Sequence, residues 1–373
     1  MTLTPSTTTT TTLIPVTLLT GFLGSGKTTM LNHIMQQPAM ADTLVIINEF
    51  GEIALDHLLV THSTENVVKE MSNGCICCTI RGDLAKTLRD LTWRFSRNGK
   101  RQFHRVLIET TGLADPAPII HTLMTDRKIA SRYRLDGIVA TIDMATGNQT
   151  LSTYHEAIKQ AAVADCLLLT KADLATPQDK AVLLQRLDEI NPAAFRYQVE
   201  QGQIEAEKLL DLGLFSPHKK TPDVERWLKE EAYLTVSART HVYHRHDELN
   251  HNHSHAKVHH DHIHDINRHD DHIRAFCFSV DKPITEESYL AWLDLLMAYV
   301  GSNILRVKGI LNIAGYDHPM VIHGVQHIFH PPVPLPSWPS EDLRSKIVFI
   351  TRDVERESVE WIFKFITNTP KRS

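Results

Sequence analysis

A glycine-rich loop near the start of the chain constrains its fold more than any other feature. The loop covers residues 21–28 and reads GFLGSGKT, which fits the pattern of a phosphate-binding loop in full. It follows an apolar, β-branched run at 13–20 and precedes a segment at 29–36 with a helical pattern. A strand, a glycine loop and a helix in this order predict a nucleotide site at the end of a buried strand.

The residue types of the loop suit phosphate. Glycines let the backbone curl so that successive N–H groups face one anion, and the helix N-terminus adds its positive end. Lys27 is expected to reach the β- and γ-phosphates, and the Thr28 hydroxyl to bind Mg²⁺. The predicted phosphate-binding residues are Gly21, Gly24, Ser25, Gly26, Lys27, Thr28 and Thr29.

Short, continuous apolar runs recur after this loop, at 43–47, 106–108, 138–142 and 166–169. Runs of this kind are typical of parallel strands buried on both faces. Helical patterns lie between some of them, including 83–95 and 178–190. We therefore predict a doubly wound α/β domain with a mainly parallel sheet, whose ligands bind at the carboxyl ends of the strands.

An acidic residue follows the run at 106–108. Glu109 begins the sequence ETTG, which ends at Gly112. A nucleotide enzyme places its magnesium partner or its water-positioning group at such a strand end, and the Gly112 N–H is suited to contact a γ-phosphate. We predict that Lys27, Glu109 and Gly112 are the catalytic residues.

A possible base-recognition motif, TKAD, follows the run at 166–169. The Asp173 carboxylate can accept both N1–H and N2–H of guanine, whereas adenine presents mismatched groups. Lys171 is expected to lie along the base. The usual motif begins with Asn, but here the residue is Thr170. We predict a preference for guanine, although Thr170 in place of Asn can remove one of the hydrogen bonds that the usual motif forms.

Three cysteines lie between the phosphate loop and Glu109. Cys75, Cys77 and Cys78 follow a turn-prone Asn-Gly pair, so the backbone can bend and present several sulfurs to one point. Three thiolates supply three of the four positions that Zn²⁺ prefers, and Cu(I) also suits such ligands. Glu52, His57 or water are candidates for the fourth position. Redox chemistry, or burial as small apolar groups, is the alternative.

Composition narrows the remaining classes of protein. The net charge of -5 gives no reason to expect nucleic acid as a partner. Five cysteines in this arrangement do not form a secreted disulfide framework, and Cys166 and Cys277 fall in predicted core strands. The Thr-rich start lacks the features of a signal peptide, and no apolar run is long enough to span a membrane. A cytoplasmic location is expected.

Histidines gather in the segment 241–272. Twelve of the chain's 23 histidines lie there, at irregular spacing and among polar residues. Such a segment cannot form a core, so we predict a flexible linker whose neutral imidazoles collect metal. A purely solubilising linker is the alternative. The twelve are His241, His244, His246, His251, His253, His255, His259, His260, His262, His264, His269 and His272.

A second, smaller α+β domain is predicted beyond this linker. Strand patterns at 273–280, 304–313, 320–328 and 347–350 accompany helical patterns at 286–300 and 354–366. Its histidines are expected to be satisfied surface groups, with metal binding as the alternative; they are His318, His323, His327 and His330. The predicted division is a disordered tail at 1–14, a nucleotide-binding domain at 15–240, the linker at 241–272 and the final domain at 273–373.

These motifs together resemble the CobW-type metal-handling GTPases, relatives of the nickel-delivery GTPases of hydrogenase and urease assembly. The resemblance runs from Pro15 onward and rests on TGFLGSGKTT at 20–29, NEFGE at 48–52, NGCICC at 73–78, ETTGLADP at 109–116, TKAD at 170–173 and the stretch at 338–350. It implies slow GTP hydrolysis coupled to metal insertion. It also implies Cys75, Cys77 and Cys78 as metal ligands, with Glu52 near the metal or magnesium.

The resulting hypothesis is a GTP-dependent metallochaperone with Mg²⁺ as cofactor and Zn²⁺, or Co²⁺, as its metal. Its partner would be a client metalloprotein, and a homo-oligomer is possible. Alternatives in the same class are cobalt delivery for cobalamin synthesis and metal insertion into a nitrile-hydrolysing enzyme. A metal buffer or a sensor that transfers no metal is the alternative of another class.

Overall fold

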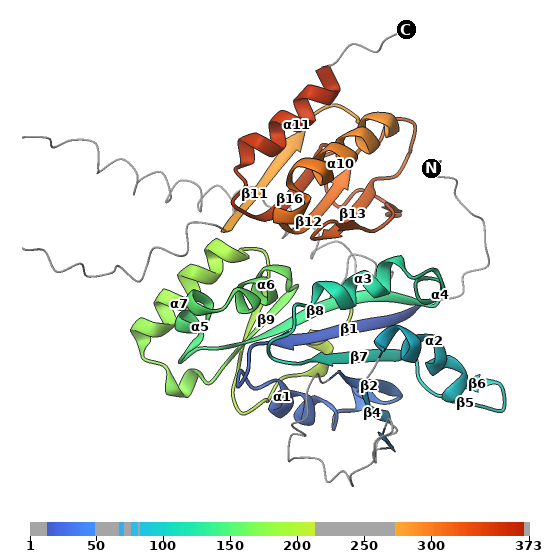
Figure 1. Cartoon of the computed structure of the whole chain (residues 1–373), viewed down its shortest axis with the longest axis vertical. Coiled ribbons are helices and arrows are strands. Elements are labelled where there is room, and N and C mark those ends of the chain that lie inside the picture. The colour runs from blue at the N-terminus through green and yellow to red at the C-terminus, as the bar shows by residue number, and fades with distance from the viewer. Residues whose placement is uncertain (1–12, 49–66, 71–75, 81–82, 213–272, 369–373) are drawn as a thin grey trace, which may run out of the picture.

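The computed structural model describes residues 13–48, 67–70, 76–80, 83–212 and 273–368 of the 373-residue chain. An eight-stranded sheet forms the centre of the first part (Figure 1), in the order β10-β9-β8-β1-β7-β2-β4-β3. All neighbours pair in parallel except β3 and β4. The strands are β1 (Ile14–Gly21), β2 (Thr43–Asn48), β3 (Val67–Glu70), β4 (Ile76–Ile80), β7 (Arg105–Thr110), β8 (Tyr133–Asp143), β9 (Cys166–Thr170) and β10 (Phe195–Val199).

Helices cover both faces of this sheet, so the predicted doubly wound α/β fold is confirmed. Helix α1 packs on one face, and α2, α3, α5, α6 and α7 pack on the other. The helices are α1 (Lys27–Ile34), α2 (Leu84–Arg94), α3 (Ala117–Thr125), α4 (Arg127–Ala130), α5 (Gly147–Thr153), α6 (His155–Val163) and α7 (Pro177–Ile190). Short 3-10 turns are η1 (Pro38–Met40), η2 (Ala172–Leu174) and η3 (Ala206–Leu209), and β5 (Ser96–Arg97) pairs with β6 (Lys100–Arg101).

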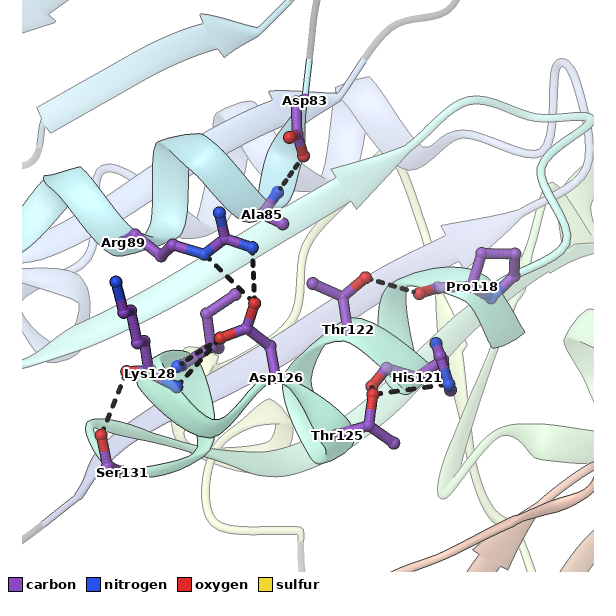
Figure 2. A network of polar contacts seen from close by, with 11 residues as sticks. Asp83, Ala85, Arg89, Pro118, His121, Thr122, Thr125, Asp126, Lys128 and Ser131 are labelled. Carbon is purple, nitrogen blue, oxygen red and sulfur yellow. Dashed lines mark hydrogen bonds and ion pairs between the residues drawn. The ribbon is translucent and has the colours of Figure 1, made fainter.

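One carboxylate joins three of these helices. Asp126 ends α3 and caps α4 by accepting from the backbone N–H groups of Lys128 at 2.9 Å and Ile129 at 3.2 Å. The same side chain accepts two hydrogen bonds from Arg89 on α2, at 3.1 and 2.6 Å (Figure 2). These bonds from Arg89 hold the pKa of Asp126 below its ordinary value. Asp83 caps the start of α2, where its carboxylate accepts from the Ala85 N–H at 2.8 Å.

The second part is an α+β domain with a five-strand path in the order β11-β16-β12-β13-β14, and β15 also pairs with β13. Its elements are β11 (Ile273–Val280), α10 (Glu286–Val300), η5 (Gly301–Asn303), β12 (Ile304–Leu311), β13 (Met320–Val325), β14 (Ile328–Phe329), β15 (Val333–Pro334), β16 (Ser345–Arg352) and α11 (Arg356–Asn368). Trp292 and Phe349 lie in the core between this sheet and its two helices. The other face of the sheet packs on α6 and α7 (Figure 1).

A buried ion pair joins the two domains. Arg306 on β12 donates to the carbonyls of Val163 at 2.7 Å and Ala164 at 2.5 Å, at the end of α6, and also to the Asp165 carboxylate. Lys308 donates to the same carboxylate. Burial alone would raise the pKa of Asp165, but the two cations lower it below its ordinary range. The cations of the second domain therefore stabilise a charge that belongs to the first.

Two predictions about the second domain need correction. The predicted strand at 320–328 is divided into β13 and β14, because Gln326 adopts a left-handed turn conformation with φ of 53°. His323 is a buried residue rather than a surface group, since β13 faces the domain boundary. His330 is partly buried, while His318 and His327 are exposed as expected.

Other sequence predictions have mixed outcomes. Cys166 and Cys277 are buried in β9 and β11, as predicted. Among the described residues, no helix is both long and apolar enough to cross a membrane. The Thr-rich residues 1–12 and the histidine segment 241–272 lie outside the described residues.

Candidate nucleotide-binding site

The phosphate loop connects β1 to α1, as the sequence predicts. Gly21, Gly24 and Gly26 have φ values of 137°, 73° and 92°, which glycine adopts without strain. A Cβ atom at Gly21 would lie 2.2 Å from the Thr141 hydroxyl oxygen, so only glycine fits at that point. Ser25 is buried and donates to the Phe22 carbonyl at 2.7 Å, which closes the turn. The loop is therefore shaped by its own sequence and by β8.

Lys27 is buried at the start of α1. Its Nζ atom donates to the carbonyls of Gly21 at 2.8 Å and Phe22 at 3.0 Å. Burial lowers the pKa of Lys27, and the nearby Glu109 carboxylate partly offsets that effect. The ammonium group is thus held against the loop that carries the predicted phosphate-binding N–H groups.

Thr28 and Glu109 come together at the end of β7. The Thr28 hydroxyl donates to Glu109 Oε1 at 3.3 Å, although 81 positions separate them in sequence. Strand register explains this, because β1 and β7 are parallel neighbours that pair Leu19 with Glu109. A hydroxyl and a carboxylate are hard oxygen ligands that suit Mg²⁺ beside a phosphate. The donor set therefore fits a magnesium ion bound together with a nucleotide.

Gly112 lies directly against the phosphate loop. A Cβ atom there would lie 2.5 Å from the backbone nitrogen of Leu23. The Gly112 carbonyl accepts from Gln160 Nε2 at 3.2 Å. A glycine is needed because the two loops are in backbone contact, and this explains how Gly112 can approach a bound phosphate.

The TKAD motif forms the opposite side of the site. Thr170 is buried, and its hydroxyl lies 2.8 Å from the Ser25 carbonyl and 3.3 Å from the Ile142 carbonyl. Thr170 thereby ties the motif to the phosphate loop, although it lacks the amide of the usual Asn. Asp173 is exposed in η2, where its carboxylate is accessible to a base.

Sequence reasoning missed Asp143, which orients Lys171. Lys171 has φ of 54°, and its Nζ atom donates to Asp143 Oδ2 at 2.7 Å. The other oxygen of Asp143 accepts from the N–H groups of Ala145 and Thr146. Burial would raise the pKa of Asp143, but the hydrogen bond from Lys171 and the backbone donors lower it. A signal was present, because Asp143 follows the apolar run at 138–142 as Glu109 follows its own run.

The predicted thiol ligands are described only in part. The backbone of Cys77 and Cys78 lies in β4, where these residues pair with Val45 and Ile46 of β2. Cys75, Glu52 and His57 lie outside the described residues. Within the ranges that the structure describes, no group of three or more potential metal ligands is found. Thr29, the last predicted phosphate-binding residue, is exposed in the first turn of α1.

Comparisons with known proteins agree with this geometry. Residues 15–197 match the CobW/HypB/UreG nucleotide-binding domain, and residues 273–365 match the CobW C-terminal domain. The zinc chaperone YjiA of Escherichia coli is 32% identical over 94% of this chain and 98% of its own. The zinc chaperone CobW of Pseudomonas aeruginosa is 27% identical over 93% and 89%. The crystal structure of Zn(II)-bound YjiA GTPase has a TM-score of 0.67 at 29% identity and covers 95% of this chain and 99% of that one.

Proposed function

We propose, from the fact that this chain belongs to the CobW/HypB/UreG family, that it is a GTP-dependent metallochaperone for zinc. The chain is a P-loop GTPase, as its motifs predict. The coupling of GTP hydrolysis to metal transfer, the metal itself and the client are the proposal. Relatives named zinc chaperones support zinc over cobalt.

Each predicted residue has a role in the proposed hydrolysis. Lys27 would leave its two loop carbonyls and pair with the β- and γ-phosphates. Thr28 and Glu109 would hold Mg²⁺, which neutralises charge on the phosphate oxygens when bound. The Gly112 N–H would stabilise the γ-phosphate as its charge develops. Asp173 and Lys171 would select the guanine base.

The arrangement of strands carries the proposed link to metal. Cys78 pairs with Ile46 on β2, and Ile46 pairs with Ile108 on β7, the residue before Glu109. Paired residues across three neighbouring strands therefore connect β4, which carries Cys78, to β7, which carries the proposed magnesium ligand Glu109. Occupation of the nucleotide site would change the position of β4 and hence the geometry of Cys75, Cys77 and Cys78.

The test is a zinc titration of the full chain loaded with GDP or with a non-hydrolysable GTP analogue. A metallochaperone needs different zinc affinities in the two states, since a nucleotide that does not change zinc affinity cannot drive its release. Cys77→Ser should remove the difference. Cys277→Ala, which alters a buried thiol of β11, is the control. Equal zinc affinity in both states, or tight binding that survives Cys77→Ser, would refute the proposal.

Deleting residues 241–272 separates this function from a metal buffer. A buffer would lose most of its zinc capacity, whereas a metallochaperone would retain GTP hydrolysis and cysteine-dependent transfer. A sensor would show GTP-dependent binding of a partner without transfer of metal. Free thiolates are required in the chaperone case, which places the proposed activity in a reducing compartment such as the cytoplasm.

A further inference from the structure

The loop Gly112–Asp115 is held from outside by α6. Gln160 is 1% exposed, and its Nε2 atom donates to the carbonyls of Gly112 at 3.2 Å and Ala114 at 3.0 Å. Both bonds reach main-chain atoms, so they fix how the peptide planes of the loop are turned. Because a trans peptide has its C=O and N–H on opposite sides, the Leu113 N–H points away from Gln160.

The same side chain carries an unsatisfied acceptor. Gln160 Oε1 is buried and has no hydrogen-bond partner within the described part of the chain. A buried unpaired acceptor costs free energy, and a donor brought to it would recover that cost. A rotation of the loop peptides that turned an N–H group toward Oε1 would supply such a donor. Gln160 therefore offers hydrogen bonds to two arrangements of the loop.

The second domain reaches the other end of this loop. Asp115 Oδ2 accepts from Lys159 on α6 at 2.7 Å and from Gln326 of the β13–β14 turn at 3.2 Å. Asp115 Oδ1 accepts from the Ala117 N–H at 2.9 Å and so begins α3. One carboxylate is thus bound by two domains at the end of the loop that contacts the phosphate-binding site.

Helix α6 is anchored to the second domain at its far end. Arg306 binds the carbonyls of Val163 and Ala164, and its ion pair with Asp165 is buried. Lys159 and Gln160 lie in the last two turns of the same helix, close before these carbonyls. A displacement of the loop would therefore act on α6 and on the β13–β14 turn together.

We propose that the loop Gly112–Asp115 couples the nucleotide site to the second domain. In this coupling Gln160 is a positioning residue for GTP hydrolysis, and Gln326 is the contact through which the second domain responds to the nucleotide. The inference rests on the GTPase activity alone and does not require zinc or its transfer.

Hydrogen exchange of the full chain tests the contact at Gln326. Amides of the β13–β14 turn should exchange at rates that differ at least about twofold between the GDP complex and the complex with a non-hydrolysable GTP analogue and Mg²⁺. Gln326→Asn keeps a residue that tolerates positive φ but shortens the side chain by one methylene. This variant should lose the difference at the turn and keep the difference at 112–115.

Gln185→Ala, on the exposed side of α7, is the matched control and should keep both differences. Equal exchange of the turn in the two complexes of the natural chain would overturn the coupling. So would a difference at the turn that persists unchanged in Gln326→Asn.

Gln160→Met tests positioning, because methionine has a similar length and no N–H donor. We expect kcat for GTP hydrolysis to fall about tenfold, while the Kd for GDP changes by less than about threefold. An unchanged kcat, or an equal loss of kcat and GDP affinity, would contradict a positioning role. If Gln160→Met does not fold, the exchange experiment on Gln326→Asn decides the proposal by itself. No zinc is present in either assay, so failure here leaves the zinc proposal standing.

Discussion

The base side and the phosphate side of the nucleotide site are built in different ways. On the base side, Thr170 and Asp143 occupy paired positions on two hydrogen-bonded strands. Their side chains then bind Ser25 and Lys171. On the phosphate side, Gly112 lies in a loop beyond the end of β7, and side chains from α6 and from the second domain hold that loop.

This difference suggests that one side of the site recognises the base and the other side responds to the γ-phosphate. Strand pairing fixes the base side, so the groups that we propose to bind guanine are already in position before the nucleotide arrives. The phosphate side depends on a few side-chain contacts and contains a buried acceptor without a described partner. Loops with few contacts are the elements that rearrange at low cost. Substitutions on the two sides should therefore affect different measured quantities.

Gly112→Ala should have the largest effect. The added Cβ would lie 2.5 Å from the Leu23 nitrogen, and the Gly112 loop should yield because the phosphate loop is fixed at both ends. Loss of one transition-state donor costs about 10²–10³ in kcat, while GDP binding should change little. Single-turnover hydrolysis and GDP titration measure the two effects. Gly99→Asn, in the distant β5–β6 turn, is the control. A loss of GDP affinity as large as the loss of kcat would contradict the conclusion that the two sides control different quantities.

Asp143→Asn should show the opposite pattern. The amide can still accept from Ala145 and Thr146, but it no longer forms an ion pair with Lys171. Loss of a charge-assisted hydrogen bond should weaken GDP binding and reduce the preference for GTP over ATP, each by about tenfold. The kcat at saturating GTP should stay near that of the natural chain. Competition between the two nucleotides provides the measurement, and unaltered selectivity would show that Asp143 does not position Lys171.

Thr170→Val should have a smaller effect. Valine keeps the shape of the side chain but removes the hydroxyl that bonds to the carbonyls of Ser25 and Ile142. We expect a loss of about 0.5–1.5 kcal/mol in stability and a modest loss of GDP affinity. Thermal unfolding with and without GDP measures both. If GDP affinity is unchanged, the hydroxyl stabilises only the fold and does not support the phosphate loop.

Acid should destabilise the second domain through His330, whose ring lies beside that of the buried His323. Burial lowers the pKa of His330 from its ordinary value of 6.5 to about 4. The unfolded chain therefore binds a proton at this ring more readily than the folded chain does. The neutral, buried ring contributes its full share of the stability above pH 6.5, and that share is lost as the pH falls toward 4. His330→Gln should reduce the loss of stability between pH 7 and 5 by about 2 kcal/mol. Unfolding curves at a series of pH values measure this, and identical pH slopes in both proteins would contradict it.

Much of the fold could be predicted because its signals are local. Continuous apolar runs indicated the parallel strands, and GFLGSGKT identified the phosphate loop. The division of the strand at 320–328 was missed, since nothing in its apolar pattern marks the positive φ of Gln326. The burial of His323 was missed for a different reason, because it depends on the first domain packing against β13.

The sequence by itself determined the doubly wound fold and the phosphate loop, and it predicted the groups that we propose to bind phosphate, magnesium and base. Tertiary structure decided which distant residues support those groups. Asp143 reaches Lys171, Gln160 reaches Gly112 and Gln326 reaches Asp115 only after strands and domains have packed. The physical reason is the distance along the chain between the interacting residues. Backbone conformation and hydrophobic periodicity depend on neighbouring residues, so the sequence shows them directly. A hydrogen bond between residues 48 or 211 positions apart forms only once the chain has folded.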